Sequence, residues 1–188
     1  MKKTSLIPIC DAIFNADTTV FTDGEKLLRL SNVFDAETLT KIATALDGIN
    51  PSEKLYKDHK SRTLYDFNDQ DAITQEDIEA IQTAVETAVG TKYQSMGVSL
   101  WEDKESYYIG KHTDGEGLNA AMQIYLPAEN CALPNTGTIM YDGIQEYQVP
   151  FVPNTGYFIS NSNSIVHSSG DPVKPGMVRR SLYFYFTK

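Results

Sequence analysis

Cysteine is scarce in this chain, where only Cys10 and Cys131 occur among 188 residues. Two thiols in unrelated contexts are too few for a disulfide framework, so the sequence predicts free thiols and a reducing compartment. Long apolar runs are missing as well. Two lysines precede an apolar patch in residues 1–14, but Pro8 and Asp11 interrupt it before a signal-peptide core or a membrane span could form. A cytoplasmic protein without a membrane segment is therefore expected.

Basic residues are also under-represented, with 16 Lys and Arg against 25 Asp and Glu and a net charge of −9 at pH 7. Such a balance repels phosphate backbones, so we expect no nucleic-acid partner. A length of 188 residues suits one domain with a sizeable core and is short for two. We therefore expect one domain over residues 1–188.

The first half of the sequence predicts supporting elements. Residues 1–24 alternate short apolar runs with polar turns, and Thr22-Asp23-Gly24 predicts a turn between two strands. After a strand-like run, Asp35 is the expected N-cap of a helix. A second helix is indicated by Thr74 and Asp77, which fit a capping box with Asp in place of Glu, and Gly90 is expected to end it. Apolar stripes at helical spacing support both helices: Leu39, Ile42 and Leu46 in the first, and Ile78, Ile81, Val85 and Val89 in the second.

Residues 48–72 are polar and rich in turn formers, which predicts a surface loop. Lys54, Lys57, His59, Lys60 and Arg62 lie close together within it. The loop is either a substrate-facing lid or a solvated connector, and the connector is the commoner case for long loops. His59 is given no metal role.

From residue 98 onward, about eight short apolar or alternating runs are separated by turn residues. This pattern is typical of an antiparallel double-stranded β-helix, or jelly roll. We expect an α+β fold that is mainly β, with residues 98–188 as the jelly-roll core. Residues 1–97 would supply N-terminal strands and two supporting helices packed on one sheet.

The stretch Tyr107–Asp114, which reads YYIGKHTD, is predicted to be a strand that ends in a candidate metal site. Alternate residues of a strand share a face, so His112 and Asp114 would point the same way. His167, in the later run IVHSS, would complete a set of two imidazoles and one carboxylate. That set holds Fe(II) on one face and leaves three positions open, although Mn, Co or Ni could occupy the same ligands. Each of these residues taken singly is common in ordinary strands.

The closing segment VRRSLYFYFTK adds a fourth element, with Arg179 twelve positions after His167 and Ser181 two further on. The order H-x-D, then H, then R-x-S resembles the Fe(II)/2-oxoglutarate dioxygenase superfamily, in its small prolyl-hydroxylase-like branch. The resemblance implies that Arg179 pairs with the distal carboxylate of 2-oxoglutarate and that the Ser181 hydroxyl assists. Strand alternation places Arg179 and Ser181 on the face opposite the apolar side chains, and a shift of one residue would favour Arg180 instead.

The resemblance further implies Fe(II) held by His112, Asp114 and His167, with 2-oxoglutarate and O2 as cosubstrates. The expected activity is hydroxylation of an unactivated C–H bond with release of succinate and CO2, and desaturation remains open. Tyr108, which would share a face with His112, and Tyr125 on the next strand are candidates for the cosubstrate pocket or ordinary half-buried sheet residues. The expected substrate is a peptidyl group such as prolyl, or a small molecule.

Two other classes of protein fit parts of the pattern. One is an inactive jelly-roll module, which would have no reason to keep all four of His112, Asp114, His167 and Arg179. The other is a cupin-like metal enzyme without 2-oxoglutarate chemistry, which would not need the Arg179 and Ser181 pair. The sequence does not indicate an oligomeric state.

Overall fold

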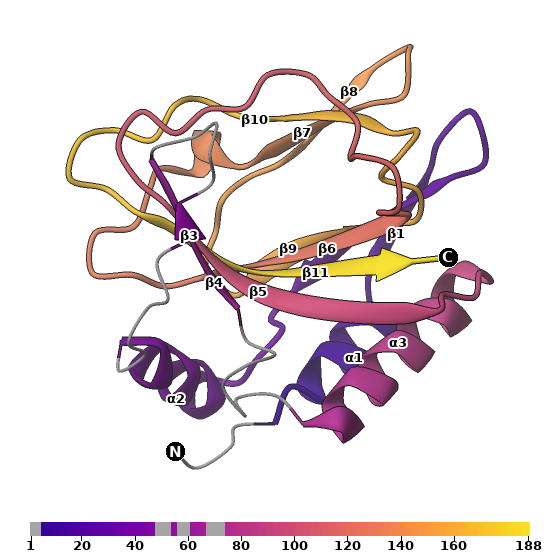
Figure 1. Ribbon diagram of the computed structural model, residues 1–188, viewed down its shortest axis with the longest axis horizontal. Helices are drawn as coiled ribbons and strands as arrows, with labels where there is room; N and C mark the ends of the chain where they lie inside the picture. The colour runs from indigo at the N-terminus through magenta and orange to yellow at the C-terminus, as the bar shows by residue number, and fades with distance from the viewer. Residues whose placement is uncertain (1–4, 48–53, 56–60, 67–73) are drawn as a thin grey trace.

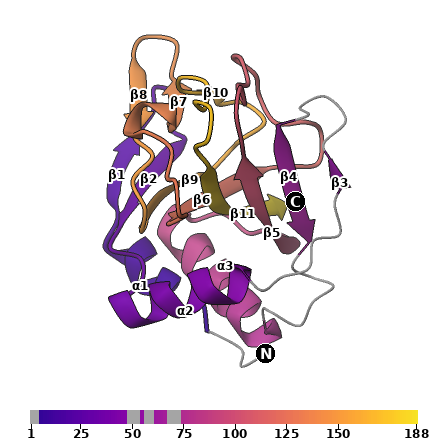
Figure 2. The ribbon, with the colours of Figure 1, turned by 90° about the vertical axis from the view of Figure 1, so that its left-hand side faces the viewer.

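A computed structural model of the chain describes residues 5–47, 54–55, 61–66 and 74–188. Two antiparallel sheets face each other, and the helices cover the outer face of the larger one (Figures 1 and 2). The larger sheet has eight strands in the order β1-β2-β9-β6-β11-β5-β4-β3, and the smaller has three in the order β10-β7-β8. This arrangement confirms the predicted mainly β jelly roll with helices on one sheet.

Apart from residues 107–114, the predicted runs of the second half lie close to the observed strands. The strand bounds are β1 (Asp17–Val20), β2 (Lys26–Ser31), β3 (Lys54–Leu55), β4 (Arg62–Asp66), β5 (Ser95–Asp103), β6 (Ala120–Leu126), β7 (Thr138–Tyr141), β8 (Glu146–Val149), β9 (Thr155–Ile159), β10 (Val166–Ser169) and β11 (Arg179–Thr187). A short 3-10 helix, Pro134–Thr136, precedes β7. The N-terminal part of the chain thus supplies four strands to the large sheet as well as helices.

Of the three α-helices in the described part of the chain, two have the expected boundaries. Helix α2 (Ala36–Asp47) begins after Asp35, whose Oδ1 accepts a hydrogen bond from the Thr38 amide at 2.8 Å. Helix α3 (Gln75–Val89) has the predicted capping box between Thr74 and Asp77, and it ends at Gly90 with φ of 79°. That φ lies in the left-handed region, which glycine adopts at little cost.

Helix α1 (Pro8–Phe14) was not predicted, because seven residues are too few for a helical period to stand out in the sequence. Tertiary contacts stabilise it instead. Its buried Ile9 and Ile13 belong to the core beneath the large sheet, and Asp77 of α3 accepts a hydrogen bond from the Leu6 amide at 2.8 Å. One carboxylate therefore caps α3 and anchors the segment that leads into α1.

Strand β11 divides the interior into two layers, as its alternation predicts. Leu182, Phe184 and Phe186 face the helices and pack with Ile81 and Val85 of α3. The opposite face of β11 looks toward the small sheet, and there it carries Arg179, Ser181, Tyr183 and Tyr185. The apolar layer fixes which face of the sheet is left for a site.

The prediction of a surface loop over residues 48–72 is wrong for Lys54–Leu55 and for Arg62–Asp66. These residues form β3 and β4, which pair with each other, and β4 also pairs with β5. The polar composition of this stretch gave no strand signal, and the pairing of β4 with β5 joins segments that lie far apart in the sequence. Residues 48–53, 56–60 and 67–73 lie outside the described residues, and so do His59 and the question of a lid. Among the helices that the structure describes, none has the length and hydropathy needed to cross a bilayer.

Candidate active site

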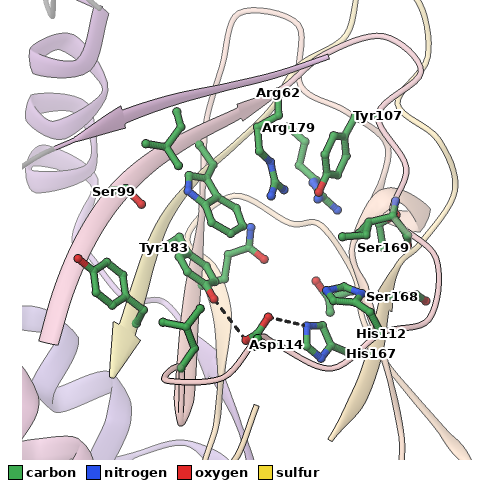
Figure 3. Close-up of a pocket in the computed structure, with 18 of the residues that line it drawn as sticks. Arg62, Ser99, Tyr107, His112, Asp114, His167, Ser168, Ser169, Arg179 and Tyr183 are labelled. Carbon is green, nitrogen blue, oxygen red and sulfur yellow. Dashed lines mark hydrogen bonds and ion pairs between the residues drawn. The ribbon is translucent and has the colours of Figure 1, made fainter. Parts of the chain in front are cut away.

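A cavity of about 390 Å³ lies between the two sheets, and it holds most of the polar side chains singled out above. Its walls come from β4, β5, β6, β9 and β11 of the large sheet, from β7 and β10 of the small sheet, and from the segment 107–118. Figure 3 shows His112, Asp114 and His167 at one end and two arginines, Arg62 and Arg179, at the other. The site therefore has a candidate metal end and a cationic end.

The predicted triad converges at the first of these ends. The candidate ligand atoms of His112, Asp114 and His167 all lie within 4.8 Å of one another. His167 Nε2 is 3.5 Å from Asp114 Oδ1, and the two imidazole rings are 4.3 Å apart between centroids. Two imidazole nitrogens and one carboxylate on one wall of a cavity form the donor set that suits a divalent transition metal with open positions.

The backbone around His112 differs from the prediction, because residues 107–114 do not form a regular strand. His112 and His167 exchange backbone hydrogen bonds of 2.9 and 2.8 Å, while the Ser169 amide donates to the Ile109 carbonyl. From Ile109 to His112 the chain advances three residues, while the paired strand β10 advances two, from Ser169 back to His167. One extra residue on the first segment is the mark of a β-bulge. The irregularity reverses the side-chain alternation between Ile109 and His112.

Tyr108 lies on the wrong side of this irregularity, so the expectation that it shares a face with His112 and Asp114 is wrong. Its side chain is 50% exposed and does not line the cavity. The neighbouring Tyr107 lines it instead and is 1% exposed. Periodicity read along a sequence fails wherever the backbone inserts an extra residue.

Both histidines are oriented by their own backbone. His112 Nδ1 lies 2.9 Å from the Gly110 carbonyl oxygen, and His167 Nδ1 lies 3.0 Å from that of Ile165. A carbonyl oxygen only accepts, so Nδ1 carries the proton and donates in each case. In the neutral ring this leaves the Nε2 lone pair for a metal, which is the usual support for a ligating histidine.

The protonation states of His112 and Asp114 suit metal binding, whereas that of His167 depends on its pairing with Asp114. Burial lowers the pKa of His112 below its usual 6.5, which favours the neutral ring. Burial alone would raise the pKa of Asp114, but its hydrogen bond and charge interaction with His167 outweigh burial and lower the pKa below 3.8. The same interaction raises the pKa of His167. A divalent cation would compete with the proton on His167 for the Asp114 carboxylate.

Arg179 forms part of the opposite end of the cavity, as its position on β11 predicts, and is only 3% exposed. Its Nε and Nη2 contact Asp103 Oδ2 at 2.9 and 2.7 Å. Its Nη1 donates to the carbonyl oxygens of Thr136 and Gly137. Arg180 points to the outer face, where its Nε donates to Glu102 at 2.8 Å.

Ser181 and Tyr125 are both fully buried but differ in their relation to the cavity. The Ser181 hydroxyl accepts a hydrogen bond from Gln123 Nε2 at 2.7 Å, and Gln123 itself lines the cavity. The Tyr125 hydroxyl lies 3.0 Å from the hydroxyl of Thr138, and Tyr125 is not among the lining residues. Ser181 therefore holds the lining residue Gln123 in place, and Tyr125 packs behind the lining of the cavity.

Sequence reasoning missed two residues of the cationic end: Arg62, which lines the cavity, and Asp103, which is buried behind the lining. Asp103 is completely buried and pairs with Arg62 as well as with Arg179. Alternation along β5 could have placed Asp103 and Trp101 on the cavity face, since both share the parity of that face. Arg62 offered no such signal, because it stands in a polar stretch whose pairing with β5 is visible only in the fold.

Comparison of the sequence with protein-family models and with curated proteins finds no match. Solved structures are similar at low identity. A prolyl-4-hydroxylase from Pseudomonas putida is 13% identical with a TM-score of 0.65, and the match covers 97% of this chain and 99% of that one. A prolyl hydroxylase from Trichoplax adhaerens, in complex with a hypoxia inducible factor peptide fragment, is 10% identical with a TM-score of 0.63, covering 96% and 90%.

A third similar structure is SnoN, a non-heme alpha ketoglutarate dependent epimerase from nogalamycin biosynthesis, which is 12% identical with a TM-score of 0.60. That match covers 97% of this chain and 80% of SnoN. These likenesses confirm, at the level of the fold, the resemblance to 2-oxoglutarate-dependent iron oxygenases with a prolyl-hydroxylase-like branch. They include more than one reaction type.

Proposed function

We propose that this chain is an Fe(II)/2-oxoglutarate-dependent dioxygenase that hydroxylates a C–H bond of a peptidyl or small-molecule substrate. The observation that carries the proposal is the division of one cavity into a His112, Asp114 and His167 cluster and a buried guanidinium end (Figure 3). A ligand with a metal-chelating 2-oxo acid at one end and a carboxylate at the other matches this division. A cupin-like metal site would not need the second end.

The residues present fit both cofactors. His112, His167 and Asp114 would hold Fe(II) through two nitrogens and one carboxylate oxygen, and Arg179 would bind the distal carboxylate of 2-oxoglutarate. When bound, the iron and 2-oxoglutarate supply the oxidising power for hydroxylation, with O2 as oxidant and succinate and CO2 as products. The chain itself orients the ligands through the carbonyls of Gly110 and Ile165.

An aromatic wall runs between the two ends. Trp101 stacks on Tyr183 with ring centroids 3.8 Å apart, and Tyr183 Oη donates to Asp114 Oδ2 at 3.4 Å. Ile109 and Leu118 add aliphatic surface to the lining. Such walls exclude water and strengthen the electrostatic interactions of bound charged groups.

The first candidate for the substrate is a peptidyl group such as prolyl, and the second is a small molecule. The likeness of the fold to two prolyl hydroxylases supports the first candidate, and the likeness to SnoN supports the second. The net charge of −9 argues against a nucleic-acid substrate. Cys10 and Cys131 are both free thiols, which supports a reducing, cytoplasmic location.

The test is an anaerobic titration of the metal-free protein with Fe(II) and 2-oxoglutarate, followed by the visible metal-to-ligand charge-transfer band. The band should appear in the wild type and vanish in His167→Ala and Asp114→Asn. Asp17→Asn, at an exposed position on β1, is the matched control and should keep it. Iron binding without the band would favour the cupin-like alternative, and no metal binding would refute the metal site.

A further inference from the structure

The cationic end of the cavity contains two arginines rather than the single one that the sequence indicated. Arg62 of β4 lies opposite Asp103 of β5, and Asp103 lies opposite Arg179 of β11. The three side chains thus form one row across three neighbouring strands, and they are 5%, 0% and 3% exposed. Figure 3 shows both guanidinium groups in the cavity beside Tyr107.

Arg179 has little hydrogen-bonding capacity left for a ligand. Asp103 takes its Nε and one Nη2 N–H, and the carbonyls of Thr136 and Gly137 take both N–H groups of Nη1. A guanidinium group has five N–H donors, so one remains, on Nη2. Bidentate recognition of a carboxylate needs two donors, and therefore a second group must contribute.

Arg62 is the group positioned to contribute. Asp103 accepts from its Nε at 2.5 Å and its Nη2 at 3.1 Å, and the guanidinium group also donates to the Tyr107 side chain. Of the five N–H donors of the group, about two are then left for a ligand. The guanidinium carbon lies 3.8 Å from the Trp101 ring centroid and 4.2 Å from that of Tyr107. The faces of the two aromatic rings contact the guanidinium group, and these cation–π contacts compensate part of the hydration that it loses on burial.

The net charge of Arg62, Asp103 and Arg179 also supports a role for Arg62 in binding a carboxylate. Burial alone would raise the pKa of Asp103, but the charges of Arg62 and Arg179 lower it, so the carboxylate is ionised. Two guanidinium groups and one carboxylate leave a single positive charge at this end. A divalent metal with Asp114 leaves a single positive charge at the other end. A dianion with one carboxylate at each end is neutralised at both, whereas Arg179 with Asp103 alone would leave the distal carboxylate without a counter-charge.

We propose that Arg62 is a second cosubstrate-binding residue, which shares with Arg179 the distal carboxylate of 2-oxoglutarate while Asp103 cancels the surplus charge. This inference rests on the proposed function. It also makes Arg62 a specificity determinant, because a 2-oxo acid without a distal carboxylate would bind the metal end but gain nothing from the row.

The experiment compares wild type, Arg62→Gln, the double variant Arg62→Gln/Asp103→Asn, and Arg180→Gln as a control on the outer face of the same sheet. Each protein is loaded with Mn(II) and titrated with 2-oxoglutarate or with 2-oxobutyrate, which has the same chelating end and no distal carboxylate. Trp101 is the only tryptophan in the chain and lies against Arg62, so its fluorescence reports binding, with calorimetry as a second readout. Thermal melting checks that each variant is folded.

Arg62→Gln is expected to weaken 2-oxoglutarate binding about 10- to 100-fold, the loss of one or two hydrogen bonds to a charged group. Binding of 2-oxobutyrate should stay unchanged. The double variant restores the single positive charge but not the hydrogen bonds of Arg62, so it should regain part of the lost affinity. Arg180→Gln should match wild type. If Arg62→Gln does not fold, Arg62→Lys keeps the charge but not the planar fork, and a weaker loss confined to 2-oxoglutarate is expected.

Three results would overturn the inference: unchanged 2-oxoglutarate binding in a folded Arg62 variant, equal weakening of both 2-oxo acids, or no recovery in a folded double variant. The first would leave Arg62 as a purely structural partner of Asp103. Failure of the proposed function looks different, because the wild type itself would then bind the metal and neither 2-oxo acid.

Discussion

The buried carboxylate of Asp103 gives the sharpest test of how the cavity is held together. Asp103→Asn keeps the shape of the side chain but removes the charge that faces two buried guanidinium groups. Asp103 is 0% exposed and makes four contacts with them, of 2.5, 2.7, 2.9 and 3.1 Å. Leaving a buried charge without its partner costs about 3–5 kcal/mol. For a domain of this size, that cost lowers the melting temperature by roughly 6–20 °C.

Urea unfolding at neutral pH measures this free energy, with Asp17→Asn as the matched control. Asp17 is 79% exposed and pairs with Arg29 at 3.4 Å, so its variant should lose less than about 1 kcal/mol. The pKa of Asp103 is lowered in the folded state, so its contribution is present above about pH 4 and is lost as the pH falls through the folded pKa. The wild type and Asp103→Asn should therefore converge in strong acid. A neutral-pH loss as small as that of Asp17→Asn would refute the view that the row is a tight, ionised cluster.

Two further predictions concern the support of the large sheet. Hydrogen bonds from Lys92 and from the Tyr93 amide lower the pKa of Glu86 to about 2, so its stabilisation is complete above about pH 4.5 and disappears toward pH 2. Glu86→Gln should cost about 1–2 kcal/mol at neutral pH in urea unfolding, and a gap that stayed constant into acid would contradict this reasoning. A Cβ at Gly156 of β9 would lie 2.2 Å from the Gln123 carbonyl oxygen, which is backbone and cannot rotate away. Gly156→Ala should therefore lower the free energy of unfolding by about 1–3 kcal/mol, whereas Gly115→Ala, with nothing within 4 Å, is the control; equal losses would disprove the steric explanation.

Local signals were enough to predict several features correctly. Asp35, Thr74, Asp77 and Gly90 mark helix ends because capping depends on hydrogen bonds within one turn, and the structure has those helices. Strict alternation along β11 separated the helix-facing side from the cavity side, because a strand buried on one face must keep period two. It correctly oriented Arg179 inward and Arg180 outward.

The amino-acid sequence alone thus indicated the fold class and the face of Arg179, because these follow from strand-like runs and from the period-two pattern of β11. It indicated the set of His112, Asp114 and His167 through residue type and motif order. The tertiary structure alone decided the rest. The irregular pairing of residues 109–112 with β10 turned Tyr108 outward and Tyr107 inward, and β4 brought Arg62 beside Asp103 across 41 residues of sequence. Both outcomes depend on pairing between segments far apart in the chain, whose energy no local pattern records.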